Sequence, residues 1–145
     1  MDSSRAEWSE VWLGVAAAVA KRSSCSRSKV GAVLVFMNSE TFVGYNGPPS
    51  NMLNCDQGGC PRGRKSFEEL PHAAPFSGVG SCNAVHAEMN ALIRFQHSHQ
   101  STHRSVLRLM LEHSVLYTTR EPCERCWEQI RLAHLRRDQV VWPGK

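Results

Sequence analysis

The chain has 145 residues, of which 41% are hydrophobic and 21% are charged, and its formal net charge is +4. This length predicts one domain with a hydrophobic core, and the composition is that of a globular protein rather than a disordered or fibrous one. No apolar run approaches the roughly 20 residues that a membrane-spanning helix needs. The positive charge suits a phosphorylated or polyanionic substrate, but a charge of this size does not by itself indicate a nucleic-acid partner.

The N-terminus and the cysteine content both point to a reducing compartment. The first residues, Met1 to Ser4, lack the basic start and apolar core of a secretion signal. The chain has six cysteines, and in a reducing cytoplasm thiols are more often metal ligands than disulfide partners. We therefore expect a cytoplasmic, metal-binding protein.

Apolar residues in the first third of the chain predict one helix and two strands. Residues 5–22 carry an apolar stripe at helical spacing, and its Trp8 and Trp12 are expected in the core or in a subunit contact. Residues 30–37 form an apolar run that is typical of a buried strand. After a short turn, residues 41–45 are expected to return as its antiparallel partner.

The rest of the chain alternates between helix and strand patterns after a long irregular segment. Residues 47–82, rich in Gly, Pro and Cys, are interpreted as an insertion within a single domain that spans residues 1–145. The elements expected after it are a helix over 84–95 with Asn83 as its N-cap, a strand over 114–119, a helix over 123–134 and a strand over 139–142. This order predicts an α/β fold in which helices pack against a mixed sheet.

Two short motifs in the second half of the chain carry the residues of an open zinc site. His86 is followed two residues later by Glu88, and Pro122 precedes a C-x-x-C pair formed by Cys123 and Cys126. One imidazole and two thiolates would supply three ligands and leave the fourth position of the metal for water. A carboxylate that is not a ligand, such as Glu88, can move protons between that water and a substrate. The combination predicts a catalytic zinc.

Each motif alone is ambiguous, but the local structure expected around them strengthens the combination. A lone H-x-E is common on helices, and a lone C-x-x-C could be a redox pair or half of a structural zinc site. Here His86 and Glu88 lie in the first turns of one expected helix, and Pro122 suits the first turn of the helix that carries both cysteines. Because the positive end of a helix dipole favours thiolates, two helix starts that meet at one zinc form a coherent site.

Taken together, the H-x-E and P-C-x-x-C motifs resemble the signature of the zinc-dependent nucleobase deaminases. The chain resembles the cytidine deaminase superfamily, and within it the deoxycytidylate (dCMP) deaminases, from Ser24 to Trp142. The stretches that carry the resemblance are Lys29–Ala32, Gly44–Pro48, Cys82–Ala91 and Glu121–Cys126. It implies a cytidine-deaminase-like three-layer αβα sandwich with a central mixed sheet of four to five strands.

The resemblance also implies an activity and the residues that perform it. The activity is zinc-dependent hydrolysis of dCMP to dUMP and ammonia, and matching motif positions make Glu88 the catalytic proton carrier. By the same matching, Asn46 becomes a contact to the sugar and the backbone of Ala87 a contact to the base. The implied zinc ligands are His86, Cys123 and Cys126.

Oligomerisation and regulation are further implications of the resemblance. Many dCMP deaminases are homo-oligomers that dCTP activates and dTTP inhibits, and their effectors use the region after the Gly-Tyr-Asn-Gly stretch. The equivalent region here is Gly44–Pro48. A homo-oligomer with these two effectors is therefore expected.

A nucleotide monophosphate needs cations, and two basic clusters could supply them. Arg27 lies in a serine-rich turn before the first expected strand, where side-chain and backbone donors could hold phosphate oxygens. A solvated basic loop is the competing interpretation of this turn. The second cluster, Arg62, Arg64 and Lys65, is interpreted as solvated surface.

Four cysteines remain once the catalytic pair is set aside, namely Cys25, Cys55, Cys60 and Cys82. Four thiols are what a closed structural zinc site needs, and His72 is an alternative fourth ligand. Separate buried or free thiols are the competing interpretation, because the Cys55–Cys60 spacing is looser than that of the usual ligand pair. The three histidines after the zinc helix lie among Ser, Gln and Thr and are interpreted as an exposed loop: His97, His99 and His103.

Two other functions fit the same motifs. A deaminase of cytosine or adenine in single-stranded DNA, RNA, tRNA or a modified nucleotide would use the same zinc chemistry. Such an enzyme would benefit from exposed aromatics beside a basic groove, and the aromatics here are mostly expected in helix and strand cores. The more remote alternative is a zinc-stabilised binding module without catalysis, against which Glu88 argues.

The C-terminal end also departs from the family pattern. Many superfamily members add a helix and a fifth strand after the position of Trp142, whereas this sequence ends at Lys145. We therefore expect either a sheet completed by oligomerisation or a further C-terminal segment.

Overall fold

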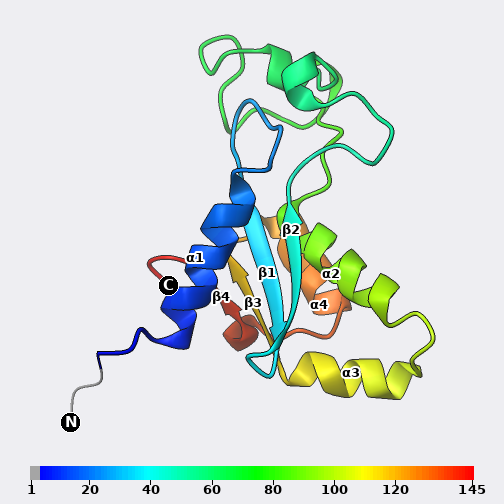
Figure 1. Ribbon diagram of the computed structural model, residues 1–145. Coiled ribbons are helices and arrows are strands. Elements are labelled where there is room, and N and C mark those ends of the chain that lie inside the picture. The colour runs from blue at the N-terminus through cyan, green and yellow to red at the C-terminus, as the bar shows by residue number, and fades with distance from the viewer. Residues whose placement is uncertain (1–3) are drawn as a thin grey trace.

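The computed structural model describes residues 4–145, which form four α-helices around one four-stranded sheet (Figure 1). The helices are α1 (Trp8–Ala20), α2 (Ala87–Ser98), α3 (Arg104–Glu112) and α4 (Glu124–Leu132). The strands are β1 (Gly31–Phe36), β2 (Glu40–Tyr45), β3 (Ser114–Thr118) and β4 (Val140–Val141). The prediction about a secretion signal rests mainly on Met1–Ser3, which lie outside the described residues.

The sheet has the strand order β2-β1-β3-β4 and is mixed. Strand β1 is central and pairs antiparallel with both β2 and β3, whereas β3 and β4 pair in parallel. The sequence explains the central place of β1, because its residues from Ala32 to Val35 are apolar and buried on both faces. A parallel pair needs a crossover connection, and α4 supplies it between β3 and β4. The predicted α/β fold with a mixed sheet is confirmed.

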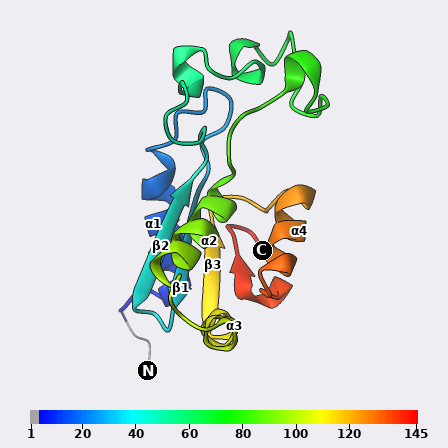
Figure 2. The same cartoon turned by 90° about the vertical axis from the view of Figure 1, so that its right-hand side faces the viewer.

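Helices cover both faces of the sheet (Figure 2). Helix α1 packs on one face against Val33, Val35 and Tyr117, and α2 and α4 pack on the other face around Phe95 and Leu116. These two apolar layers account for most of the buried side chains, and burial of such side chains is the main force that stabilises a domain.

Two glycines set how closely the helices approach the sheet. A Cβ atom at Gly31 would lie 2.0 Å from the carbonyl oxygen of Ala16 in α1. A Cβ atom at Gly44 would lie 2.1 Å from the carbonyl oxygen of Ala87 in α2. Gly44 thus allows the first turn of α2 to rest directly on β2, which fixes the start of α2 relative to the sheet.

Several boundaries differ from the sequence predictions. Helix α2 begins at Ala87 with His86 in the N-cap position, so the prediction that Asn83 caps a helix from residue 84 is wrong. The reason is an antiparallel bridge between Val85 and Gly47, which holds the residues before His86 in extended conformation.

Helix α3 was not among the predicted elements, and it crosses one end of the sheet (Figure 1). Its inner face packs through Leu107, Met110 and Leu111 against the α2 side of the core. The apolar positions within α3 follow helical spacing, but the helix is short and follows a polar stretch, so the whole segment was interpreted as a loop.

Trp8 differs from its predicted place in the core. Its side chain is 50% exposed and stacks on Trp12, with ring centroids 5.7 Å apart. Trp12 is partly buried and packs against the α1 side of the core. The alternative prediction, a subunit contact, stays a prediction. Within the described residues no helix is long and apolar enough to span a bilayer.

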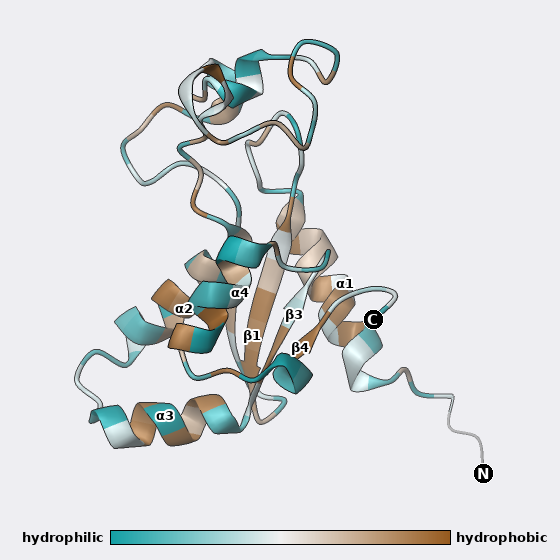
Figure 3. Ribbon diagram, turned by 180° about the vertical axis from the view of Figure 1, so that it is seen from behind, coloured by the Kyte–Doolittle hydropathy of each residue, from teal (hydrophilic) through white to brown (hydrophobic). Residues whose placement is uncertain are grey.

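The insertion, residues 47–82, extends beyond one end of the sheet and contains only three short 3₁₀ turns (Figure 1). Hydropathy colouring shows the contrast between the brown strand β1 and the mostly teal and pale insertion (Figure 3). Three of its side chains are buried, namely those of Cys55, Cys60 and Arg62. The guanidinium of Arg62 donates hydrogen bonds to the backbone oxygens of His72, Ala74, Pro75 and Gly80. This arginine therefore links the middle of the insertion to the segment that precedes Cys82.

Candidate active site

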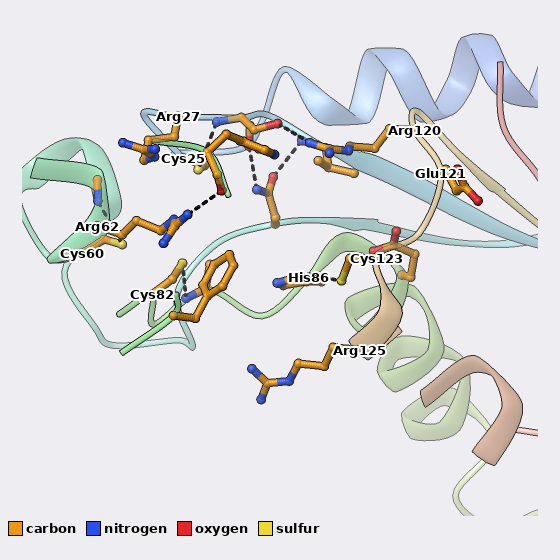
Figure 4. Close-up of a pocket in the computed structure, with 18 residues that line it drawn as sticks. Cys25, Arg27, Cys60, Arg62, Cys82, His86, Arg120, Glu121, Cys123 and Arg125 are labelled. Atoms are coloured by element: carbon orange, nitrogen blue, oxygen red, sulfur yellow. Dashed lines mark hydrogen bonds between the residues drawn. The ribbon is translucent and has the colours of Figure 1, made fainter. Parts of the chain in front are cut away.

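Two helix starts bring the predicted zinc ligands together at the end of the sheet nearest the insertion. Figure 4 shows two of these ligands, His86 and Cys123. His86 is the N-cap residue of α2, and Cys123 is the N-cap residue of α4. Cys126 lies in the first turn of α4 and is buried. Pro122 stands just before the helix rather than in its first turn, where its fixed φ still suits the entry into α4.

The geometry of these three residues fits a zinc ion. The Nδ1 atom of His86 lies 3.6 Å from the Sγ of Cys123 and 3.0 Å from the Sγ of Cys126. Zinc–ligand distances of about 2.0–2.1 Å to nitrogen and about 2.3 Å to sulfur place two tetrahedral ligand atoms about 3.6 Å apart. The first distance matches this value, and the second requires a small outward movement of the Cys126 sulfur.

The electrostatics of the triad also favour a cation. Burial raises the pKa of the Cys126 thiol well above its usual range, and the neighbouring Glu88 and Cys123 raise it further. A divalent cation between the sulfurs reverses this effect, because its charge stabilises the thiolate. The residues present therefore fit zinc.

Glu88 is the acidic residue of the first turn of α2, and only 3% of its surface is exposed to solvent. Its carboxylate accepts a hydrogen bond from the hydroxyl of Thr118 at 3.4 Å and one from the Cys126 thiol at 3.5 Å. Thr118 is the last residue of β3, so the sheet itself orients the carboxylate. Glu88 is thus held beside the ligand triad, at the position that a proton carrier needs.

A cavity of about 300 Å³ is lined by Glu88 and by two of the three ligands, His86 and Cys123, which are labelled in Figure 4. Its wall is formed by the turn before β1, the end of β2, the insertion and the entry to α4. Six charged side chains line it, and four of them are arginines: Glu88, Glu121, Arg27, Arg62, Arg120 and Arg125. The excess of arginines makes the cavity suitable for an anionic ligand.

The predicted substrate contacts lie in or beside this cavity. Asn46 lines it, but its side chain already accepts hydrogen bonds from the backbone of Val30 and the hydroxyl of Ser23, and donates one to the carbonyl of Ser28. One amide hydrogen of Asn46 remains for a ligand. Ala87 is fully buried in the first turn of α2. The roles of both residues stay predictions.

Arg27 lines the cavity, yet its guanidinium has several partners in the protein. It donates to the backbone oxygens of Lys65, Ser66 and Leu70 and lies 4.3 Å from the ring centroid of Phe67. Its phosphate role also stays a prediction. Arg120 and Arg125 also line the cavity, and neither was predicted from the sequence as a substrate contact. Arg120 stands two residues before Pro122 and Arg125 lies between the two cysteines, and these positions were the available signal.

The second set of cysteines gathers at the other end of the same cavity, where Cys25, Cys60 and Cys82 contribute to the wall (Figure 4). Burial, followed by the neighbouring thiols of Cys60, Cys25 and Cys82, raises the pKa of Cys55 to about 12. All six cysteines of the chain are free thiols. Among the described residues, the His86 triad is the group of three donors whose atoms all lie within 4.8 Å of one another, so no three of the other four thiols lie that close together.

His72 lines the cavity, whereas the three histidines that were expected in an exposed loop are not among its lining residues. His97 and His103 are exposed, as expected for a loop, although His97 belongs to the last turn of α2. His99 is partly buried instead, with its Nε2 atom 3.2 Å from Glu40 and its ring packed on Phe95.

Comparisons with known proteins agree with this site. The family model described as "Cytidine and deoxycytidylate deaminase zinc-binding region" matches residues 6–142. The deoxycytidylate deaminase of Mycobacterium phage D29 is 40% identical over 141 residues, which cover 97% of each chain. The deoxycytidylate deaminase of Schizosaccharomyces pombe is 30% identical over 95% of this chain, which corresponds to 37% of the length of that protein.

The fold has a solved counterpart as well. The crystal structure of the dCMP deaminase from the cyanophage S-TIM5 in complex with dCMP and dUMP superposes with a TM-score of 0.61 at 24% identity. The match covers 97% of this chain and 83% of that one. With the His86, Cys123 and Cys126 triad beside Glu88, the matches establish that this chain belongs to the zinc-dependent cytidine and deoxycytidylate deaminase family.

Proposed function

We propose that this protein catalyses the zinc-dependent hydrolytic deamination of dCMP to dUMP and ammonia. The observation that carries the proposal is the buried Glu88 beside the His86–Cys123–Cys126 triad at the end of an arginine-lined cavity. A relative of nearly equal length that is named deoxycytidylate deaminase, at 40% identity, supports the choice of substrate.

The residues of the chain explain how such a reaction proceeds. Zinc held by His86, Cys123 and Cys126 would supply the Lewis acidity that lowers the pKa of a water molecule towards neutrality. Glu88 takes the first proton of this water and delivers it to the ring nitrogen N3 while the oxygen bonds to C4. Glu88 then takes the second proton, from the C4 hydroxyl, and delivers it to the amine, so that ammonia leaves and a C–O bond replaces the C–N bond. Thr118 and the first turn of α2 hold the carboxylate in place during both transfers.

The charge of the cavity favours a nucleotide over a nucleoside. Arg27 and Arg62 donate to backbone oxygens, whereas the one hydrogen bond of the Arg120 guanidinium within the described residues goes to the hydroxyl of Ser28, at 3.2 Å. Within residues 4–145, the Arg125 guanidinium has neither a hydrogen bond nor an ion pair. We assign Arg120 and Arg125 as the main cations for the 5′-phosphate, because charge-assisted hydrogen bonds to arginine are the strongest that a phosphate can receive.

A polynucleotide substrate is the second candidate, and one observation favours it. Contrary to the expectation that the aromatics lie in the core, Phe67 and Phe76 are 52% and 62% exposed, and Phe76 lines the cavity. Exposed rings beside arginines can stack the bases of a single strand. Each ring is already covered on one face, however, by Arg27 and Arg62 respectively. The nucleotide is therefore the better-supported substrate.

The deciding experiment measures ammonia release and identifies the product by chromatography for dCMP, deoxycytidine, dCTP and a cytosine-containing single-stranded oligonucleotide. Turnover confined to dCMP is expected, and turnover of the oligonucleotide instead would replace the proposal with polynucleotide editing. Glu88→Gln is expected to lower kcat by about 10²–10⁴-fold, the usual contribution of a general acid–base. If neither the wild type nor this variant released ammonia from any of the four compounds, only the non-catalytic zinc module would remain.

We also propose that the protein is a cytoplasmic homo-oligomer regulated by dCTP and dTTP. The exposed Trp8 and Val11 on α1 offer an apolar surface for a second copy. The backbone bridge between Gly47 and Val85 joins the Gly44–Pro48 region directly to the residue before His86, which gives an effector a route to the zinc site. Light scattering tests the oligomer. A velocity curve for dCMP that neither nucleotide changes would contradict the regulation.

A further inference from the structure

Asn46 follows the last residue of β2 and lines the cavity, and its side-chain amide has a fixed orientation. Its Oδ1 atom accepts a hydrogen bond from the backbone N–H of Val30 at 2.8 Å, and its Nδ2 atom donates one to the backbone carbonyl of Ser28 at 2.7 Å. A backbone N–H only donates and a carbonyl only accepts, so a reversed amide would place donor against donor and acceptor against acceptor. The partners therefore determine which side of the amide carries the nitrogen.

The hydroxyl of Ser23 completes the hold on Asn46. Ser23 is only 3% exposed, and its Oγ atom lies 2.7 Å from both the side-chain Oδ1 and the backbone carbonyl oxygen of Asn46. The same Oγ accepts the backbone N–H of Cys25 at 3.1 Å, so its single hydrogen is left to be shared between the two oxygens of Asn46. Because both acceptors belong to one residue, this hydroxyl fixes the side chain of Asn46 relative to its own backbone.

Ser23 acts on a ligand only through Asn46. Among the described residues, those that line the cavity include Val30, Ser28 and Asn46 but not Ser23. The hydrogen-bond partners of the Ser23 hydroxyl are Asn46 and the backbone of Cys25. Ser23 is thus a positioning residue rather than a contact to the ligand.

The hydrogen bonds of Asn46 leave its side chain with a donor but no acceptor for the ligand. Val30 and Ser23 occupy both lone pairs of Oδ1, and Ser28 takes one of the two hydrogens of Nδ2. The deoxyribose of dCMP has two oxygens that could accept the remaining hydrogen, the ring oxygen and the 3′-hydroxyl. The ring oxygen is the weaker acceptor, because its lone pairs delocalise towards C1′. The 3′-hydroxyl oxygen is therefore the better partner.

We propose that Ser23 positions the substrate sugar by holding the Asn46 amide so that its remaining N–H donates to the 3′-hydroxyl oxygen of dCMP. This inference rests on the proposed function. An amide that is already oriented loses less conformational entropy on binding than a freely rotating one. Ser28 extends the same network, since its carbonyl accepts from Asn46 and its hydroxyl accepts from Arg120 at 3.2 Å. One turn thus sets the distance between the sugar contact and the proposed phosphate contact.

Substrates with and without the 3′-hydroxyl test the proposal. Ser23→Ala is expected to raise the KM for dCMP about three- to tenfold, the usual contribution of a neutral hydrogen bond. Its kcat should change less than about twofold, because the hydroxyl contacts Asn46 and Cys25 rather than Glu88. For 2′,3′-dideoxycytidine 5′-phosphate, the KM should be raised in the wild type already, and Ser23→Ala should not raise it further.

Two further variants make the test specific to the hydroxyl. Ser26→Ala is the matched control, since it removes an exposed hydroxyl of the same turn that donates to the carbonyl of Gly63, and it should leave both KM values unchanged. Ser23→Cys fills the same space with a weaker donor, so it should give an intermediate KM for dCMP alone, and it replaces Ser23→Ala if that variant does not fold.

A double-mutant cycle supplies the remaining check. In the Asn46→Ala background, Ser23→Ala should have no further effect on the KM for dCMP, because the amide that it positions is absent. Additive effects of the two substitutions, or an equal rise in KM for dCMP and the dideoxynucleotide in Ser23→Ala, would overturn the role of Ser23 alone. Equal KM values of the wild type for the two nucleotides would do the same. A wild-type protein that does not turn over dCMP would overturn the proposed function and this inference together.

Discussion

The catalytic centre and the insertion face each other across one cavity, yet different forces hold them in place. Glu88 and the zinc triad stand on α2 and α4, whose inner sides rest on the sheet through a continuous apolar core. The insertion has no such layer and is held by backbone hydrogen bonds and by the buried Arg62. The comparison teaches that a rigid scaffold positions the chemistry, while polar groups shape the opposite wall of the cavity.

Removal of zinc is expected to have the largest effect and to separate the two regions. A strong chelator should abolish deaminase activity, because the catalytic zinc is lost, while the helical circular dichroism of the sheet domain persists. Trypsin should cut the chelated protein first at the exposed Arg64 and Lys65, because the insertion has no apolar core. Mass spectrometry of the early fragments provides the check. Early cleavage spread evenly over α1 and α4 would show that the two regions do not differ in this way.

Truncation of the core is expected to destabilise the whole domain, unlike truncation in the insertion. Phe95 is fully buried between α2 and the sheet, so Phe95→Ala should lower the free energy of unfolding by about 3–5 kcal/mol. Phe76 is 62% exposed, and Phe76→Ala should change that free energy by less than about 1 kcal/mol. Urea unfolding followed by circular dichroism measures both values. Similar losses in the two variants would contradict the proposed difference between the regions.

Removal of a cavity arginine is expected to affect the nucleotide more than the nucleoside. Arg120→Gln should raise the KM for dCMP about tenfold or more, since a hydrogen bond to a charged group contributes about 1.5–3 kcal/mol. The kcat/KM for deoxycytidine should stay close to that of the wild type, because a nucleoside has no phosphate. Arg108→Gln on α3, at the far end of the sheet, is the matched control. An equal loss on both substrates would assign Arg120 a structural role.

The smallest expected effect is on the free energy of unfolding at alkaline pH, where Tyr117 of β3 ionises. Burial raises the pKa of Tyr117 above its ordinary value of 10.0, so the folded state holds this proton more tightly than the unfolded state does. The stability that follows is fully present below about pH 10 and is lost as the pH rises through the folded pKa. Tyr117→Phe should therefore flatten the alkaline decline in the free energy of unfolding. Parallel pH profiles of the two proteins would contradict this role of Tyr117.

The sequence predicted the elements whose residues carry regular apolar patterns, and it was less successful where distant segments interact. The run from Val30 to Met37 indicated the central strand because every position is apolar. The start of α2 was misplaced because the bridge between Gly47 and Val85 joins residues that are far apart in the chain. Helix α3 was missed because the polar residues before it concealed its short amphipathic pattern.

The sequence alone determined the chemistry of this protein: a histidine, a glutamate and a C-x-x-C pair in an order that the zinc deaminases share. Local spacing suffices for this, because each motif lies within one helical turn and its residue types limit what it can bind. Only the tertiary structure decided that Arg120 and Arg125 share a cavity with Glu88, and that Cys25, Cys60 and Cys82, from three segments, line its opposite wall. Those groups meet through long-range packing of loops on the sheet, which no periodicity within the chain records.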